Sequence, residues 1–342
     1  MCTALHFKTN DRYFGRTLDN DCSFGEKVVI TPRNFPFEFR NGKKSEHHYA
    51  IIGTALIKED YPLYFDAVNE KGLCIAGLRF AQSAKYSKQC DSKESISVFE
   101  LIPRLLCECK SVKEVTEIIK NSVIVDTPFS QELLSAPLHW MIADSESTMV
   151  LEAVESGIKI YDTNIGVLTN EPPFPIQLAK LNDYMCLSNN AAKNNFSKEI
   201  QLNEYSRGMG AIGLPGDLSS SSRFVRAAFF KLNSVCEKDE NTSISQFFHI
   251  LDTVSQPLGG CITENGKYET TVYTSCCNAD KGIYYYTTYG DRTVKAVDLH
   301  AEDLEGEILI SYNMESKLTL RFQNHLSPPC CDTHKEQVPS AF

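Results

Sequence analysis

The second residue of the chain is a cysteine, and this position gives the side chain an unusual chemical opportunity. Removal of Met1, which a small second residue permits, would leave a thiol and a free α-amine together on Cys2. An α-amine and a thiol titrate within about one pH unit of each other, so the nucleophile would carry its own base. Position alone is more typical of a buried cysteine that has no chemical role.

Two charged residues in the next segment strengthen the chemical interpretation. The first twenty residues alternate between apolar and polar types and contain a turn sequence near residue 10, which predicts a β-hairpin. A tight hairpin would place Arg16 and Asp19 beside Cys2. Arg16 would stabilise a thiolate, and Asp19 would accept hydrogen bonds from the α-ammonium group. The alternative is an ordinary ion pair on the surface of a hairpin.

The elements that must position these residues occur in blocks of strands and blocks of helices. The predicted strands cover residues 28–31 and 49–57, a pair around the turn at 69–72 that ends in 73–80, then 138–143, 148–153 and 158–169, with a last group over 270–320. The predicted helices cover two segments within 97–121, where Ser111 begins a capping box, and residues 221–235 and 244–254. Because strands and helices occur in separate blocks and do not alternate strictly, the order indicates an α+β layer structure and not a parallel βαβ sheet.

Composition narrows the class of protein. The apolar fraction of 42%, with 19 Phe and 15 Tyr, is typical of a globular chain. No composition break divides it, so we expect a single domain over residues 1–323 and a disordered tail over 324–342. No apolar run approaches the roughly 18 residues of a membrane span, and the first residues lack the pattern of a secretory signal. We therefore expect a cytoplasmic protein that does not bind a membrane.

Cysteine usage and charge exclude further classes. The 13 cysteines include no CxxC pair, which favours reduced thiols over a disulfide framework or a zinc site. With 34 basic and 44 acidic residues the net charge is −10, which argues against a nucleic-acid partner. The chemistry that Cys2 offers needs no cofactor and no metal.

Five separated strings carry a resemblance to a known family. In chain order they are Cys2-Thr3, FGRTLD, NEKGL, GVLTN and GLPGDLSSSSRFVR. Together they resemble the choloylglycine hydrolase family, which includes bile salt hydrolases and penicillin V acylases, and the resemblance extends from Cys2 to about Leu299. It implies the four-layer αββα fold of N-terminal nucleophile hydrolases, and a homotetramer is common in the family.

The resemblance also implies roles for single residues. Cys2 matches the nucleophile, Arg16 and Asp19 match the charged pair beside it, Asn170 matches a residue of the oxyanion region, and Arg223 matches a further active-site cation. Independently of the family, Asn170 ends a predicted strand, where its amide could donate to a developing oxyanion. A turn-forming Asn would look the same, and Arg223 would otherwise be interpreted as a cation on a helix surface.

One position departs from the family pattern. Arg79 stands where bile salt hydrolases of the family usually have Asn and penicillin V acylases often have Tyr. The family Asn donates to the oxyanion through its side chain. A guanidinium can also donate and adds positive charge, but it is longer and can point elsewhere.

By resemblance, the expected partners are glycine and taurine conjugates of bile acids, whose amide bond Cys2 would attack. The candidate pocket walls are Leu18, Ile57, Phe129 and Leu134, although ordinary core packing explains each of them equally well. Ser206-Arg207-Gly208 resembles the selectivity loop of the family, in which Ser-Arg tends toward glycine conjugates. A planar guanidinium at Arg207 would match the planar carboxylate of glycine; a solvated loop charge is the alternative.

Two other functions stay open at this point. A penicillin V acylase or another N-acyl amidase would use the same mechanism. This alternative stays open because Arg79 replaces the Asn that is usual in bile salt hydrolases. A non-catalytic protein that binds nucleotides would rest on the GxGxxG string at residues 208–213. A polar stretch precedes this string, so the strand-to-helix context of a dinucleotide site is missing.

Overall fold

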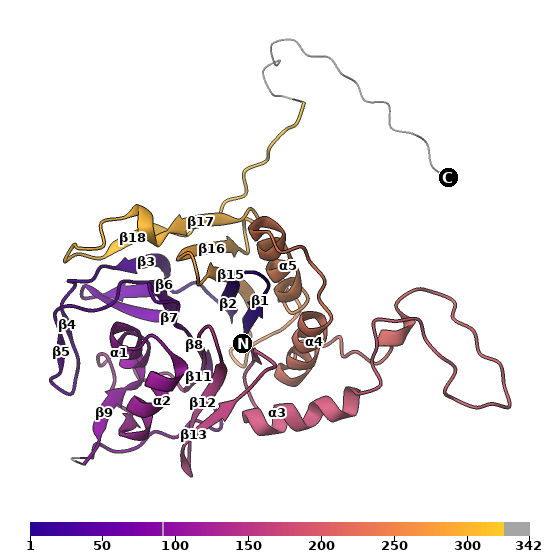
Figure 1. The fold of residues 1–342 in the computed structure, drawn as a ribbon, viewed down its shortest axis with the longest axis horizontal. Helices are drawn as coiled ribbons and strands as arrows, with labels where there is room; N and C mark the ends of the chain where they lie inside the picture. Colours follow the sequence, from indigo (N-terminus) through magenta and orange to yellow (C-terminus); the bar gives the residue numbers. More distant parts are fainter. Residues whose placement is uncertain (91, 325–342) are drawn as a thin grey trace.

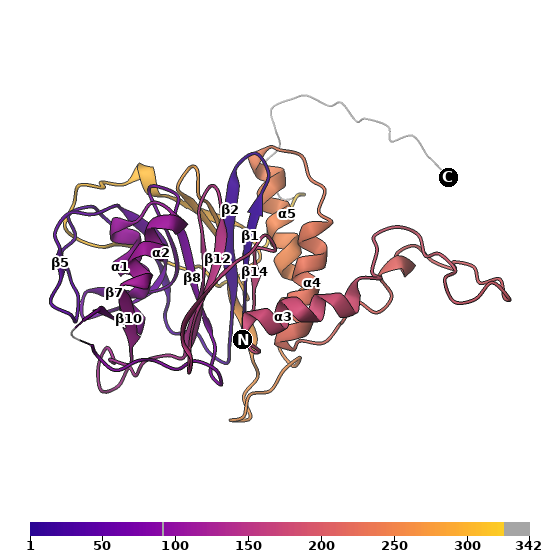
Figure 2. The same ribbon diagram turned by 60° about the horizontal axis from the view of Figure 1, so that its bottom comes forward.

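Two β-sheets face one another and helices cover both outer faces (Figures 1 and 2). This arrangement comes from a computed structural model that describes residues 1–90 and 92–324. Helices α1 (Leu101–Glu108) and α2 (Val112–Lys120) cover one sheet, and α4 (Ser220–Leu232) and α5 (Glu240–Asp252) cover the other. The predicted α+β fold class with four αββα layers is therefore confirmed.

The six-stranded sheet is built around the hairpin at the N-terminus. Its order is β14 (Val167–Leu168), β1 (Cys2–Lys8), β2 (Arg12–Asn20), β15 (Thr270–Asn278), β16 (Ile283–Thr288) and β17 (Lys295–Asp298), with every neighbouring pair antiparallel. The predicted hairpin is confirmed, and its register places Cys2 opposite Leu18. Strands from the two ends of the sequence thus lie on either side of β2.

The second sheet has eight antiparallel strands. Its order is β13 (Gly157–Asp162), β12 (Thr148–Val154), β11 (Leu138–Ala143), β8 (Cys74–Arg79), β7 (Tyr61–Asn69), β6 (Ile51–Lys58), β3 (Lys27–Thr31) and β18 (Ile310–Asn313). Two small ribbons pair β9 (Glu94–Ser97) with β10 (Ser122–Val125) and β4 (Phe37–Glu38) with β5 (Lys44–Ser45).

Two apolar clusters hold these layers together. One lies between the sheets and beneath α4 and α5, and it contains Cys2, Leu18 and Phe224. The other lies between the eight-stranded sheet and α1 and α2, and it contains Leu105 and Trp140. Because both faces of β1 are covered, the strand is buried at nearly every position and holds Cys2 firmly.

Two parts of the chain differ from the sequence-based expectation. The single strand predicted over residues 158–169 is wrong: β13 ends at Asp162, and β14 belongs to the other sheet. The chain turns between them through Gly166, whose φ of +60° suits glycine. A short helix, α3 (Phe174–Lys180), follows Pro173 and was not expected. Of the predicted tail, 324–342, all residues from 325 onward lie outside the described residues.

Within residues 1–90 and 92–324, no helix is long and apolar enough to cross a membrane.

Candidate active site

Cys2 and Arg16 meet on one face of the first hairpin. Because Cys2 pairs with Leu18 across the strands, and Arg16 lies two residues before Leu18, all three side chains project from the same face. Cys2 is 4% exposed, and Nη2 of Arg16 donates a hydrogen bond to its Sγ. A buried thiolate at this position would therefore have a cation in direct contact.

Arg16 reaches from β2 across to the facing sheet. Its Nη1 donates to the carbonyl oxygens of Phe65 and Gly77, and its Nε donates to Thr17 O at 3.1 Å. Burial acts to lower the pKa of Arg16, but the negative charge available at Cys2 and at nearby acidic groups raises that pKa above its ordinary value. The guanidinium therefore stays protonated while it contacts the sulfur.

Asp66 on β7 is a buried counter-charge that sequence reasoning did not single out. It is 2% exposed and accepts hydrogen bonds from Tyr284 OH at 2.6 Å, Tyr273 OH at 2.7 Å and Ser275 Oγ at 3.0 Å. Burial raises the pKa of Asp66, and the charge of Arg16 opposes the rise. An acidic residue in the middle of an apolar strand was the available signal, since such a residue needs partners inside the protein.

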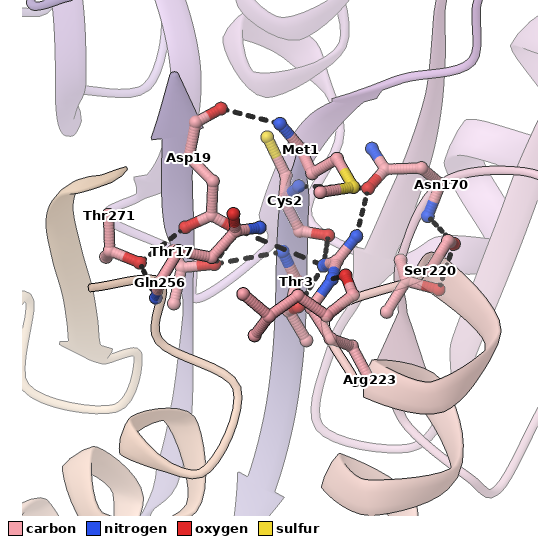
Figure 3. A network of polar contacts seen from close by, with 12 residues as sticks. Met1, Cys2, Thr3, Thr17, Asp19, Asn170, Ser220, Arg223, Gln256 and Thr271 are labelled. Atoms are coloured by element: carbon pink, nitrogen blue, oxygen red, sulfur yellow. Dashed lines mark hydrogen bonds and ion pairs between the residues drawn. The ribbon is translucent and has the colours of Figure 1, made fainter. Parts of the chain in front are cut away.

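Arg223 lies beneath the nucleophile and joins three parts of the chain. It is fully buried on α4, and its Nη1 donates to Cys2 O and Thr3 Oγ1, both at 2.6 Å. Its Nη2 donates to Asn170 Oδ1 at 2.6 Å (Figure 3). The interpretation of Arg223 as a helix-surface cation is therefore wrong, because the guanidinium fixes the backbone of β1 and the amide of Asn170 together.

Asn170, and not Asp19, contacts the backbone nitrogen of Cys2. That nitrogen donates to Asn170 Oδ1 at 2.9 Å. Asp19 Oδ1 instead accepts from Thr271 Oγ1 at 2.6 Å, and Asp19 Oδ2 lies 3.9 Å from Nη1 of Arg223. Burial raises the pKa of Asp19, and Arg223 opposes the rise. The expected hydrogen bonds from the α-ammonium to the Asp19 carboxylate are not made while Met1 is in place.

Met1 is present in this structure, and its ammonium group is held on two sides. It donates to Asp19 O at 2.7 Å, as Figure 3 shows, and to Glu269 Oε1. Cys2 N is consequently a peptide nitrogen here and cannot act as a base. The geometry is that of the unprocessed chain.

Arg79 contributes its backbone to the site, and its side chain extends to the surface. Asn170 Nδ2 donates to Arg79 O at 2.8 Å, so one of its two amide protons is used and the other is available to an oxyanion. The Arg79 side chain is exposed at the end of β8 and has no hydrogen bond or ion pair with other described residues.

The predicted pocket walls lie in different places. Leu18 belongs to the apolar cluster of Cys2, whereas Ile57 packs against the cluster beneath α1 and α2. Phe129 packs edge-on against Phe99, with ring centroids 5.3 Å apart, and Leu134 is 75% exposed. The structure thus brings only Leu18 of this set to the nucleophile.

Arg207 lies in the segment between α3 and α4, which projects from the body of the molecule (Figure 1). The residue is exposed, and the GxGxxG string beside it forms a single 3-10 turn, Met209–Ala211, with no strand before it. The context of a dinucleotide site is absent from these described residues. Among the described residues, no group of three or more His, Cys, Asp or Glu side chains could hold a metal ion.

Comparison with known proteins agrees with this geometry. Residues 2–312 match the family model of linear amide C–N hydrolases, choloylglycine hydrolase family. The chain is 52% identical to a bile salt hydrolase/transferase of Lactiplantibacillus plantarum, over 93% of this chain and 98% of that protein. The crystal structure of the C2A mutant of a conjugated bile acid hydrolase from Clostridium perfringens superposes with a TM-score of 0.87 at 36% identity, covering 95% of this chain and 100% of the other.

A penicillin V acylase from Agrobacterium tumefaciens is similar in fold. Its TM-score is 0.72 at 21% identity, and the match covers 92% of each chain. The fold and the family expected from the sequence are therefore both confirmed. The chain belongs to the choloylglycine hydrolase family of linear amide C–N hydrolases.

Proposed function

We propose that this chain is a bile salt hydrolase that cleaves the amide bond of glycine- and taurine-conjugated bile acids. The observation that carries the proposal is the contact of Arg16 with the Cys2 sulfur, in a chain 52% identical to a bile salt hydrolase/transferase. Removal of Met1 would convert Cys2 N into a free α-amine that still faces Asn170 Oδ1. The nucleophile and its base would then reside on one residue.

The reaction would proceed through a thioester. The α-amine accepts the thiol proton, the thiolate attacks the amide carbonyl carbon, and the free amide proton of Asn170 faces the developing oxyanion. The α-ammonium then protonates the leaving amine as the C–N bond breaks. Water attacks the thioester, and the thiolate is released with the bile acid.

From these contacts we infer supporting roles for the buried cations. Arg16 would hold the thiolate, and Arg223 would hold Cys2 O and Asn170 Oδ1 at fixed positions. Asp19 would balance the charge of Arg223. These roles need no cofactor.

We expect glycine conjugates to be preferred, with Arg207 as the selecting cation. Because Arg207 lies on the projecting segment, it would act only if assembly or loop movement brings that segment to a nucleophile. The segment exposes Phe196 to 80% and Tyr205 to 85%, which favours burial against another copy of the chain. We therefore retain the homotetramer as part of the proposal, with a cytoplasmic location.

Relatives named hydrolase/transferase suggest a second use of the thioester. An amine could attack the acyl group in place of water, which would form a new amide. We include this transfer reaction in the proposed function.

One assay tests the proposal. Processed protein, with Met1 loss verified by intact mass, is given glycocholate, taurocholate or penicillin V, and the released amine or acid is measured. Cleavage of both bile salts, faster for glycocholate, is expected. Cleavage of penicillin V but of neither bile salt would identify the protein as a penicillin V acylase. Binding of the ligands without any cleavage would identify it as a non-catalytic binding protein. Arg207→Gly should narrow the gap between the two conjugates, and an unchanged gap would remove Arg207 from selectivity.

A further inference from the structure

The Met1 ammonium occupies a small site built from protein groups beside the nucleophile. Its two acceptors are Asp19 O at 2.7 Å and the carboxylate of Glu269. Glu269 precedes β15, is 6% exposed, and belongs to a different part of the chain from the hairpin it meets. The structure therefore shows an ammonium group in an ion pair that is shielded from solvent.

Glu269 has few other partners. Its Oε2 accepts a weak hydrogen bond from Cys261 Sγ at 3.8 Å, and Met1 supplies its only cationic contact within the described residues. A carboxylate in a sheltered position without a cation is costly. Once Met1 is removed, Glu269 would favour any ammonium group that enters the same place.

The site lies within reach of the reacting sulfur. The Met1 nitrogen is joined to Cys2 through one peptide unit, and the Cys2 thiol is the strongest charge influence on that nitrogen after burial itself. Burial lowers the pKa of the Met1 ammonium below its ordinary value.

We propose that Asp19 O and the Glu269 carboxylate form the binding site for the acceptor amine when the enzyme transfers its acyl group. The proposal rests on the transfer reaction included in the proposed function. The ligand class is a primary ammonium compound, because both acceptors need N–H donors and Met1 supplies them here as a primary ammonium group.

The transfer step balances without another reactant. The bound ammonium gives one proton to the neutral α-amine of Cys2, and the resulting amine forms a C–N bond with the thioester carbon. The C–S bond breaks, and the sulfur takes the second proton from the new amide nitrogen. The products are an amide and a Cys2 residue with a thiol and an α-ammonium group.

The partition of one thioester between water and amines isolates this site. Glycocholate supplies the acyl group, and glycinamide and hydroxylamine are offered in separate reactions at neutral pH. Glycinamide is largely an ammonium ion under these conditions, whereas hydroxylamine is uncharged. In each reaction we measure the ratio of transfer product, an amide or a hydroxamate, to free bile acid. This ratio is plotted against the amine concentration. The slope of the plot depends only on steps after the thioester forms, because both products come from the same thioester.

Glu269→Gln should reduce the slope for glycinamide at least tenfold and change the slope for hydroxylamine less than twofold. Glu269→Asp, which keeps the carboxylate, should restore part of the glycinamide slope. The matched control is Glu264→Gln, an exposed glutamate on the same connection, which should change neither slope. Melting curves of all variants report on folding.

Three results would overturn the inference. An unchanged glycinamide slope in Glu269→Gln would mean that the acceptor binds elsewhere. Equal losses for both amines would mean that Glu269 shapes the thioester and does not bind a cation. Hydrolysis without transfer to any amine in the wild-type protein would remove the reaction itself. Absence of glycocholate hydrolysis would instead refute the proposed function, so the two failures are distinguishable.

Discussion

Replacement of Arg223 by Lys tests whether this buried cation positions the reacting groups or only stabilises the fold. Arg223 donates to Cys2 O, Thr3 Oγ1 and Asn170 Oδ1, and also to Leu218 O at 3.0 Å. One lysine ammonium could replace the pair of bonds from Nη1 and would lose the other two. At about 1.5–3 kcal/mol for a hydrogen bond to a charged group, we expect a loss of roughly 3 kcal/mol in the free energy of unfolding.

Arg226→Lys is the matched control on the same helix. Arg226 is 7% exposed and donates to three backbone carbonyls, those of Thr253, Pro215 and Asp217, none of which contacts Cys2. It should lose about 2 kcal/mol of stability with little change in turnover. Arg223→Lys should lower kcat/KM for glycocholate at least about tenfold, which corresponds to about 1.4 kcal/mol.

The assay combines urea unfolding with initial rates measured well below the midpoint of unfolding. Equal losses of kcat/KM in the two variants would show that activity follows stability alone. Wild-type rates in Arg223→Lys would show that the positions of Cys2 O and Asn170 Oδ1 do not matter to the chemistry. Either result would refute the positioning role of Arg223.

Three further predictions concern single side chains. Cys2→Ser should lose at least about a hundredfold in turnover with an unchanged melting temperature, since a hydroxyl is a far weaker nucleophile; near-normal rates would place the chemistry elsewhere. Arg79→Asn should keep bile salt hydrolysis within about threefold, because Asn170 uses only the carbonyl of residue 79; near-complete loss would give the guanidinium an essential role. Burial and nearby cations lower the pKa of His6 to about 4 from 6.5. As the pH falls, the unfolded chain therefore protonates His6 at a higher pH than the folded chain does, and the free energy of unfolding drops by about 2 kcal/mol between pH 7 and pH 5. A urea midpoint that falls as much in His6→Gln as in the wild-type protein over this range would contradict the prediction.

Local sequence patterns predicted the hairpin and thereby one face of the site. The alternation of apolar and polar residues predicted the two strands. Because side chains alternate between the two faces of a strand, the predicted pairing then put Arg16 near Cys2. The helices were predicted from their period and from serine caps. Ser111 Oγ accepts from Glu114 N at 3.2 Å and begins α2, whereas α5 begins four residues earlier than predicted and is capped by Asp239. These contacts are close in sequence, so short patterns are enough to indicate them.

The other half of the site depends on contacts between distant segments. Asn170 reaches Cys2 because β14 pairs with β1, and the sequence suggested instead one long strand over 158–169 that ended there. Arg223 looks like a surface cation until α4 is packed against β1. The end of a predicted strand made Asn170 a candidate oxyanion donor, but only the family resemblance pointed to Arg223, because local periodicity does not show which helix packs on which strand. Neither the local sequence patterns nor the family resemblance pointed to Asp66 or Glu269.

The charges around the nucleophile link processing of the chain to acceptor binding. Three cations face three buried carboxylates: the Met1 ammonium, Arg16 and Arg223 against Asp19, Asp66 and Glu269. Loss of Met1 leaves the total charge of these groups unchanged, because Cys2 acquires an α-ammonium group. The new ammonium faces Asn170, however, so Glu269 loses its cationic partner. In the thioester the sulfur is uncharged and the α-amine is neutral, so two cations, Arg16 and Arg223, face three carboxylates, and this state gains most from a further cation. A primary ammonium beside Glu269 supplies that charge at the place from which an amine can attack the thioester.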